Sequence, residues 1–221
     1  ENYNRLGQRL NTWLSSQTSA GILFETDLRL RPNGDSGLLA VSVDAFRDYQ
    51  LKHAWVWEHQ ALSRARFCAG DPAVGERFEA IRIEILRQQR DLTKLREEVI
   101  AMRRKMLDAH ASHSENEFDL KQDPGGIIDV EFIVQYLVLG YAHQHAELTG
   151  NLGNIALLRI AGELGLINSG QAEAVGNAYR EYRRLQHAKR LNANPQARND
   201  RESLEKHIVA VNQLWQAIFI D

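Results

Sequence analysis

The chain of 221 residues carries 27 lysines and arginines and 29 aspartates and glutamates, so its formal net charge at pH 7 is −2. This balance argues against a protein that coats nucleic acid or a membrane surface, because such binding draws on a strong basic excess. The mean hydropathy of −0.42 and the lack of an apolar run of about 20 residues exclude a transmembrane helix. The one cysteine, Cys68, cannot form an internal disulfide, which favours a reducing cytoplasm.

The first residues predict an amphipathic helix. Tyr3, Leu6 and Leu10 recur at three- and four-residue spacing, and Trp13 continues the same face. The chain starts with Glu1 rather than Met, and this residue already lies inside the helical pattern. We therefore expect the chain to be a piece of a longer protein.

Residues 22–43 change from helical to strand-like spacing. Residues 22–31 alternate apolar and charged side chains, residues 32–37 are dense in turn formers, and residues 38–43 are apolar and rich in valine. This pattern predicts two strands joined by a turn, at the end of a larger sheet. Because two strands alone are only marginally stable in water, we expect them to have a further partner.

From Ser42 onward the sequence predicts helices almost throughout. Ser42 can cap the first of them, and Asp71-Pro72 is a good start signal for another, with Asp at the N-cap and Pro at the first helical position. Residues 127–141 are apolar on nearly every side, which is typical of a central helix in a bundle. Further helices are predicted for residues 53–66, 92–106, 154–164, 169–191 and 200–219. The predicted fold class is therefore mainly α with a small β portion (α+β).

The segment 25–31 places four charged side chains on one face of a predicted strand. Asp27 offers hard carboxylate oxygens of the kind that Mg²⁺ prefers. Arg29 and Arg31 offer fork-shaped donors to phosphate oxygens. One interpretation is a site for a polyphosphate with a divalent metal. The other is a solvated outer face with cross-strand ion pairs, each worth about 0–1 kcal/mol, and the pattern alone leaves both open.

The loop before the apolar helix begins with Lys121 and contains the pair Gly125-Gly126. A glycine pair at this point lets a ligand approach the helix N-terminus, where an anion is favoured, and Lys121 can add a positive charge. Glycine pairs before helices are also common turn devices, and Asp129 and Glu131 favour the helix dipole by lying in the first turns. On spacing alone the structural interpretation is the stronger one.

The segment 55–66 combines aromatic and basic residues. Trp55 and Trp57 indicate packing in a core or between domains. Arg64 and Arg66 can face a phosphate or pair with nearby carboxylates, and the sequence leaves both alternatives open.

Residues 21–32, residues 57–66 and residues 125–132 form three blocks that occur in this order. Together they resemble the bacterial glutamine synthetase adenylyltransferase family, and the helices between and after them extend the resemblance over essentially the whole chain. The resemblance implies a bifunctional enzyme with two related nucleotidyltransferase halves. One half attaches AMP from ATP to a tyrosine of glutamine synthetase, and the other removes it by phosphorolysis. Two features are more similar to the C-terminal, adenylylating half: the motif Trp-Glu-His-Gln-Ala-Leu, and the chain end after a Trp-bearing helix.

The catalytic domain of that family is similar to the DNA polymerase β-type nucleotidyltransferases, which use a Gly-Ser turn, an Asp-x-Asp pair and a third carboxylate. The resemblance places Asp27 at the third carboxylate, as a catalytic residue and a ligand of Mg²⁺. The Gly-Ser and Asp-x-Asp elements are not in this sequence, and we expect them to precede Glu1. Because two-metal catalysis needs the full set of carboxylates, we expect the chain by itself to be inactive.

The resemblance also implies which residues contact the nucleotide and how the chain divides. Residues 1–70 correspond to the C-terminal part of the nucleotidyltransferase domain, and residues 71–221 correspond to a helical bundle. The nucleotide-binding residues implied in this way are Arg29, Arg31, Lys121, Gly125 and Gly126.

The expected partners are ATP with Mg²⁺, glutamine synthetase and a PII-type signal protein, with no nucleic acid and no membrane. An alternative is a non-catalytic helical interaction module that binds glutamine synthetase or a PII-type protein. A Gly-Ser turn with Asp-x-Asp upstream of Glu1 would favour the enzyme, and its absence would favour the module.

Overall fold

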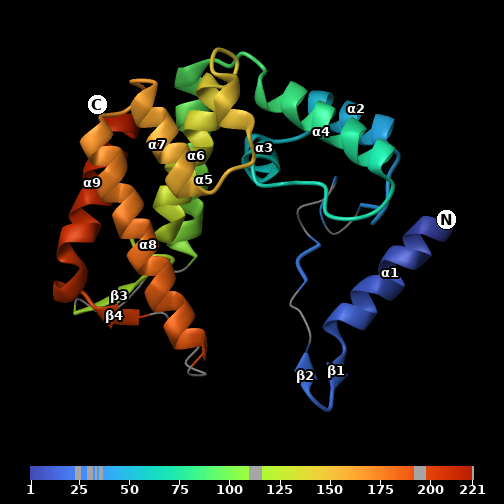
Figure 1. The fold of residues 1–221 in the computed structure, drawn as a ribbon, viewed down its shortest axis with the longest axis horizontal. Helices are drawn as coiled ribbons and strands as arrows, with labels where there is room; N and C mark the ends of the chain where they lie inside the picture. Colours follow the sequence, from blue (N-terminus) through green and yellow to red (C-terminus); the bar gives the residue numbers. More distant parts are fainter. Residues whose placement is uncertain are drawn as a thin grey trace.

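The computed structural model describes residues 1–22, 26–28, 32, 34, 37–109, 116–191 and 198–220. Helices dominate these ranges and the strands are two or three residues long, so the predicted class, mainly α with a small β portion, is confirmed. The longer helices are α1 (Asn2–Ser15), α2 (Val43–Lys52), α3 (Val56–Leu62), α4 (Pro72–Leu86), α5 (Leu92–Asp108), α6 (Ile127–Tyr141), α7 (Asn154–Glu163), α8 (Ser169–Leu191) and α9 (Glu205–Phe219). Figure 1 shows α1 apart from a middle group of α2, α3 and α4 and from a larger bundle of α5 to α9. Within the described residues, no helix has the length and apolar character that crossing a membrane requires.

Helix α1 is amphipathic as predicted, but its apolar face is exposed. None of its residues is buried. The exposed fractions of its large apolar side chains are 79% at Tyr3, 48% at Leu6, 46% at Leu10 and 65% at Trp13. An exposed apolar face of this kind is a feature of surfaces that another protein segment covers.

The first predicted strand, residues 22–31, is present only at its start. Ile22 ends β2 (Gly21–Ile22), which pairs in antiparallel fashion with β1 (Gln17–Thr18). Residues 26–28 are not in a strand. The remaining positions of this prediction, residues 23–25 and 29–31, lie outside the described residues.

The prediction of a second strand at residues 38–43 is wrong. This segment is irregular as far as Ser42, which caps α2 as predicted by accepting the Ala45 amide at 3.1 Å. The side-chain amide of Asn4 in α1 takes the place of a neighbouring strand, because it pairs with both backbone groups of Ala40. Its Nδ2 donates to the Ala40 carbonyl oxygen at 3.2 Å, and the Ala40 amide donates to its Oδ1 at 3.0 Å.

The middle group of helices has a small core of its own between α2, α3 and α4. The rings of Phe46 and Phe78 lie 5.6 Å apart at its edge. Asp71 caps α4 by accepting the Ala73 amide at 2.8 Å, and Pro72 occupies the first turn, as predicted. The buried members of this core are Leu62, Ile81 and Ile85.

His59 of α3 is buried at the border between this group and the bundle. Its Nε2 lies 3.0 Å from the Gln50 carbonyl oxygen, which can only accept, so Nε2 carries the proton. Its Nδ1 lies 3.1 Å from Arg90 Nη2, which can only donate, so Nδ1 accepts. Burial, followed by the positive charge of Arg90, lowers the pKa of His59 to about 4. The fold therefore holds this imidazole in one neutral tautomer.

Arginine side chains also connect the middle group to the bundle by donating to backbone carbonyls of residues 142–152. Asn151 makes a bond in the opposite direction, from its Nδ2 to the Ala65 carbonyl oxygen at 3.2 Å. The arginine distances are 2.7 Å from Arg82 Nη2 to the Thr149 oxygen, 3.2 Å from Arg87 Nε to the Ala142 oxygen and 2.9 Å from Arg64 Nη1 to the Leu152 oxygen.

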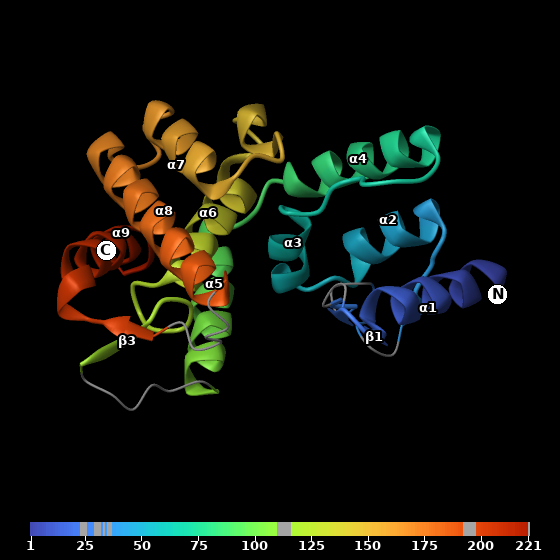
Figure 2. The ribbon, with the colours of Figure 1, turned by 60° about the horizontal axis from the view of Figure 1, so that its bottom comes forward.

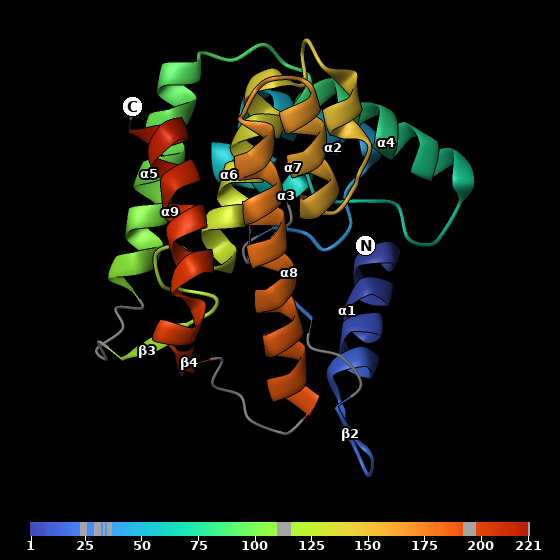
Figure 3. The same ribbon diagram turned by 60° about the vertical axis from the view of Figure 1, so that its left-hand side comes forward.

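Helix α6 is the centre of the bundle, as its apolar sequence predicts. It contacts α3, α5, α7, α8 and α9, and Figures 2 and 3 show these helices around it. Most of its side chains are buried. Strand β3 (Glu117–Asp119) pairs in antiparallel fashion with β4 (Arg198–Asp200), so the segment before α6 is tied to the segment before α9.

A buried ion pair fixes the entry into α6. Arg103 of α5 and Asp129 in the first turn of α6 are 2% and 6% exposed at their side chains, and Arg103 Nε donates to Asp129 Oδ1. Arg103 Nη2 donates to the Gln122 carbonyl oxygen at 2.7 Å, and the Gly125 amide donates to Asp129 Oδ2 at 2.6 Å. Burial raises the pKa of Asp129, against the lowering effects of Arg103 and of this amide. The pair thus joins α5, α6 and the preceding loop.

We expect Asp129→Ala to lower the free energy of unfolding by about 3–5 kcal/mol, because it leaves the Arg103 guanidinium buried without a counter-ion. Denaturant unfolding followed by circular dichroism measures the change. The control is Asp48→Ala on α2, which removes an exposed ion pair with Lys52 and is expected to cost less than about 1 kcal/mol. Equal effects of the two substitutions would contradict the role assigned to the buried pair.

We expect His59 to make the fold less stable as the pH falls from 6.5 towards 4. The unfolded chain binds a proton on this imidazole below pH 6.5, whereas the folded chain does so only near pH 4. Because one pKa unit corresponds to about 1.4 kcal/mol, the loss over this interval is about 3 kcal/mol.

Free energies of unfolding at pH 7 and pH 4.5 are compared between the unaltered chain and His59→Gln. The variant is expected to lose this part of the pH dependence, and His53→Gln, at an exposed position, is expected to keep it. The same pH dependence in all three proteins would show that His59 is not responsible.

Candidate functional site

The predicted site residues fall on two parts of the molecule. Asp27 lies between β2 and α2, and its side chain is exposed. Arg29 and Arg31 lie outside the described residues. Lys121 is exposed in the loop before α6. Gly125 and Gly126 are buried at the end of that loop.

The two glycines have packing reasons for their small size. Gly125 has a φ of +89°, and a Cβ there would lie 3.0 Å from the side chain and carbonyl oxygen of Ile208. A Cβ at Gly126 would lie 2.8 Å from the Leu120 carbonyl oxygen. The Ile127 amide at the start of α6 donates to the same oxygen at 2.8 Å. These contacts explain the glycine pair structurally, and its nucleotide-binding role remains a prediction.

Six polar residues of α3, the turn after it, α6 and α8 form a group that we call the polar seam, in which two hydrogen bonds join four of the members. They are Gln60 of α3, Arg64 in the turn after α3, Glu131 and Gln135 of α6, and Tyr179 and Arg183 of α8. Residues four apart lie on the same face of a helix, so α6 and α8 each contribute two neighbouring side chains. The Tyr179 hydroxyl lies 3.3 Å from Glu131 Oε1, and Gln60 Nε2 donates to Gln135 Oε1 at 3.0 Å.

Positive charge exceeds negative charge at the polar seam. Burial raises the pKa of Glu131, and the Tyr179 hydroxyl, Arg183, Arg64 and Lys121 act to lower it. The two arginines donate to uncharged acceptors, Arg183 to Gln186 Oε1 at 2.8 Å and Arg64 to the Leu152 carbonyl oxygen. Three cationic side chains therefore act on one partly buried carboxylate.

Part of this site was visible in the sequence and part was not. Arg64 and Lys121 were candidates for phosphate contacts, and Glu131 and Gln135 stand out as polar interruptions of an apolar helix. Tyr179 and Arg183 were missed. The available signal is that Tyr179 and Arg183 are four residues apart, which places both on the face of α8 turned towards α6.

Asp27 is the one predicted metal ligand. No group of three or more His, Cys, Asp or Glu side chains gathers to hold a metal ion in the part of the chain that the structure describes. Mg²⁺ is commonly held by one or two carboxylates together with substrate phosphates and water. The exposed carboxylate of Asp27 fits this mode of binding, in which the chain supplies a single ligand.

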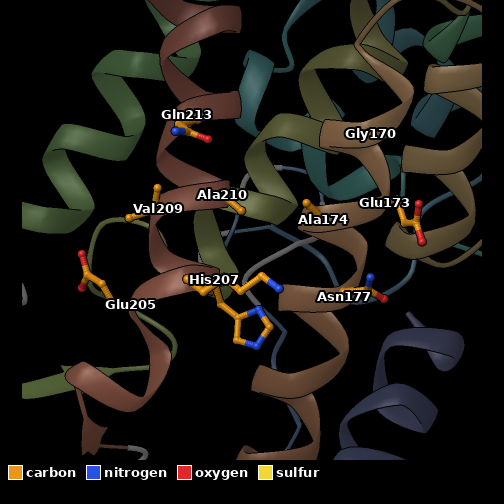
Figure 4. A pocket seen from close by; sticks show the side chains of 10 residues that line it. Gly170, Glu173, Ala174, Asn177, Glu205, His207, Val209, Ala210 and Gln213 are labelled. Carbon is orange, nitrogen blue, oxygen red and sulfur yellow. The ribbon is translucent and has the colours of Figure 1, made fainter.

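Cavities also lie in the part of the chain that the structure describes, and two of them adjoin α3 and α8. One of about 770 Å³ is lined mainly by apolar side chains of α2, α3, α4 and the segment before α2, and it also includes Arg64 and Arg66. The other, of about 540 Å³, lies between α8 and α9. Figure 4 shows Ala174 of α8 opposite Ala210 of α9 across it. Only the first shares a residue, Arg64, with the polar seam.

Comparison with known proteins places both parts of the chain. Residues 1–81 match the family model described as "Glutamate-ammonia ligase adenylyltransferase". Residues 93–215 match the model described as "GlnD PII-uridylyltransferase". The first match covers α1, Asp27, α2 and α3, and the second covers the bundle with four of the six residues of the polar seam.

Relatives of the chain carry the name "Bifunctional glutamine synthetase adenylyltransferase/adenylyl-removing enzyme", among them the following three. The protein of Aromatoleum aromaticum is 69% identical over 192 residues, which is 87% of this chain and 20% of the relative. That of Nitrosomonas europaea is 56% identical over 231 residues, covering 98% of this chain and 25% of the relative. That of Bordetella bronchiseptica is 54% identical over 221 residues, covering 100% and 23%.

The chain thus spans about a fifth to a quarter of the length of the curated relatives that it matches. The two family models and the relatives agree with the three sequence blocks. The chain belongs to the glutamine synthetase adenylyltransferase family, and it corresponds to one segment of its longer bifunctional members.

Proposed function

We propose that the chain is part of a cytoplasmic enzyme that transfers AMP from ATP to a tyrosine of glutamine synthetase and also removes it by phosphorolysis. The observation that carries this proposal is 69% identity over 87% of the chain to a relative with both activities in its name. We assign the chain to the C-terminal, adenylylating half on the block Trp57–Leu62 and on the helix that carries Trp215. A PII-type signal protein is the proposed regulatory partner.

In the proposed reaction, the tyrosine hydroxyl attacks the α-phosphorus of ATP in line. The bond from that phosphorus to the bridging oxygen breaks, and pyrophosphate leaves. Asp27 is proposed to hold Mg²⁺ and to orient the nucleophile. When bound, the metal would neutralise phosphate charge and lower the pKa of the attacking hydroxyl. Arg29, Arg31, Lys121, Gly125 and Gly126 are the proposed nucleotide contacts, the two arginines as fork-shaped donors.

The proposed division assigns residues 1–70 to the C-terminal part of a nucleotidyltransferase domain and residues 71–221 to a helical domain. The exposed apolar face of α1 supports the first part, since it offers a surface for the rest of such a domain to cover. Helix α4 follows the proposed boundary and packs on α2 and α3, so the two parts share an interface there.

Asp27→Asn in the full-length protein is expected to abolish adenylylation, because an amide is a poor substitute for a carboxylate as a ligand of Mg²⁺. The measurement is incorporation of AMP from labelled ATP into glutamine synthetase, with circular dichroism to show an unchanged fold. Asp48→Asn, at an exposed carboxylate on α2, is the control and is expected to keep full activity. Full activity of the Asp27 variant would refute the assignment.

The 221-residue chain alone is expected not to adenylylate glutamine synthetase, because one carboxylate does not make a two-metal site. Labelled ATP, Mg²⁺ and glutamine synthetase are incubated with the chain, and the full-length protein serves as the positive control. Labelling by the chain alone would contradict this expectation and would require a complete catalytic set within it.

A further inference from the structure

The polar seam has the geometry of a built site and not of a chance meeting of surface charges. Two hydrogen bonds between helices fix its register, from Tyr179 to Glu131 and from Gln60 to Gln135. Because each bond joins a different pair of helices, α3, α6 and α8 are aligned with one another at this level. Figure 1 shows α6 between α3 and α8, which agrees with this arrangement.

The two arginines of the seam are held in place by uncharged partners, and Lys121 lies near the seam. Arg64 is anchored by the Leu152 carbonyl oxygen, and Arg183 is anchored by the side chain of Gln186, which is buried. Lys121 makes no hydrogen bond or ion pair with its side chain among residues 116–191 or the other described ranges. None of these bonds cancels a positive charge, so the three cations retain their capacity to bind an anion.

Glu131 supplies the negative charge that faces these three cations. It is partly buried, and its hydrogen bond comes from the uncharged Tyr179 hydroxyl, not from an arginine. Counting these four groups, the local charge is positive, whereas the chain as a whole is slightly negative. This local excess of positive charge favours the binding of an anion.

We propose that Arg64, Lys121 and Arg183 bind the polyphosphate of the nucleotide, and that Glu131 is a positioning residue that sets the charge of this site. Arginine forks match the oxygens of a phosphate group, and a lysine adds a compact charge beside them. The identity of the ligand rests on the proposed function, whereas the existence of the anion site rests on the seam itself. The site adds Arg64 and Arg183 to the residues that the sequence assigned to the nucleotide.

Binding of inorganic pyrophosphate to the 221-residue chain, measured by isothermal titration calorimetry, tests the site without requiring catalysis. Arg183→Gln and Lys121→Gln are each expected to raise the dissociation constant about 10-fold, the usual effect of losing one charge-assisted hydrogen bond. Arg184→Gln, the next residue of α8, is the matched control, because that arginine is exposed and paired with Glu181. Its dissociation constant is expected to stay unchanged.

Glu131→Gln gives the sharpest test, because its expected effect has the opposite sign. Loss of the carboxylate makes the site more positive, so pyrophosphate is expected to bind more tightly. A residue needed only for the fold would weaken binding when it is replaced. Circular dichroism of each variant shows whether the helices are retained.

Several results would overturn the proposal. The first is that pyrophosphate does not bind the unaltered chain at millimolar concentration. The second is that Arg183→Gln and Arg184→Gln change the dissociation constant equally. The third is that Glu131→Gln binds pyrophosphate more weakly while its helices are retained. AMP, with its single phosphate, is expected to bind more weakly than pyrophosphate, and equal binding would refute the polyphosphate assignment.

The test is separable from that of the proposed function. Asp27→Asn is expected to leave pyrophosphate binding unchanged while it abolishes adenylylation. If that variant keeps its transfer activity and pyrophosphate still binds at the seam, the proposed catalytic role of Asp27 fails and the anion site stands.

Discussion

The buried ion pair between Arg103 and Asp129 is the constraint on which the rest of the bundle depends. It has one partner on α5 and one in the first turn of α6, and the same two side chains hold the backbone at Gln122 and Gly125. Taking two charges out of water is costly unless their hydrogen bonds are made, so this geometry permits little displacement. The ion pair thereby fixes the start of α6 independently of the apolar contacts along the helix.

With its start fixed, α6 presents two kinds of surface to its neighbours, one apolar and one polar. Most of its surface is apolar and is buried against the neighbouring helices, where burial supplies the stability. Glu131 and Gln135 interrupt that surface one turn apart and meet polar side chains of α8 and α3. A helix that must bury nearly all of its surface retains polar groups only where each has a partner, which is the case for these two.

The sequence predicted the local features of this molecule well. Periodicity located the helices, the apolar run identified α6 as central, and Ser42 and Asp71 marked the helix starts that they cap. These predictions succeeded because each depends on residues within one or two turns. The second strand was mispredicted because the backbone of Ala40 makes its hydrogen bonds with the side chain of Asn4, which is far away in the sequence, and not with a neighbouring strand.

The candidate site was predictable to a lesser degree for the same reason. The glycine pair and Lys121 could be found as a local motif, whereas the partners of Glu131 come from three separate elements. Tyr179 and Arg183 have ordinary helical spacing in a polar helix. Only the packing of α8 on α6 brings both of them near Glu131. Asp27 was assigned by resemblance, because nothing in its local pattern distinguishes a metal ligand from a solvated carboxylate.

The arginine bonds between the middle helices and the bundle have a consequence for how this protein tolerates change. Arg64, Arg82 and Arg87 all donate to main-chain oxygens of residues 142–152, and every amino acid supplies such an oxygen. Apart from Asn151, whose side chain donates to Ala65, the accepting loop can therefore change its side chains without losing these bonds, provided that its backbone keeps its course. The donors have no such freedom, since a shorter side chain does not reach. The arginine bonds thus constrain the side chains of the donors alone, whereas Asn151 is constrained by its own bond to the Ala65 carbonyl oxygen.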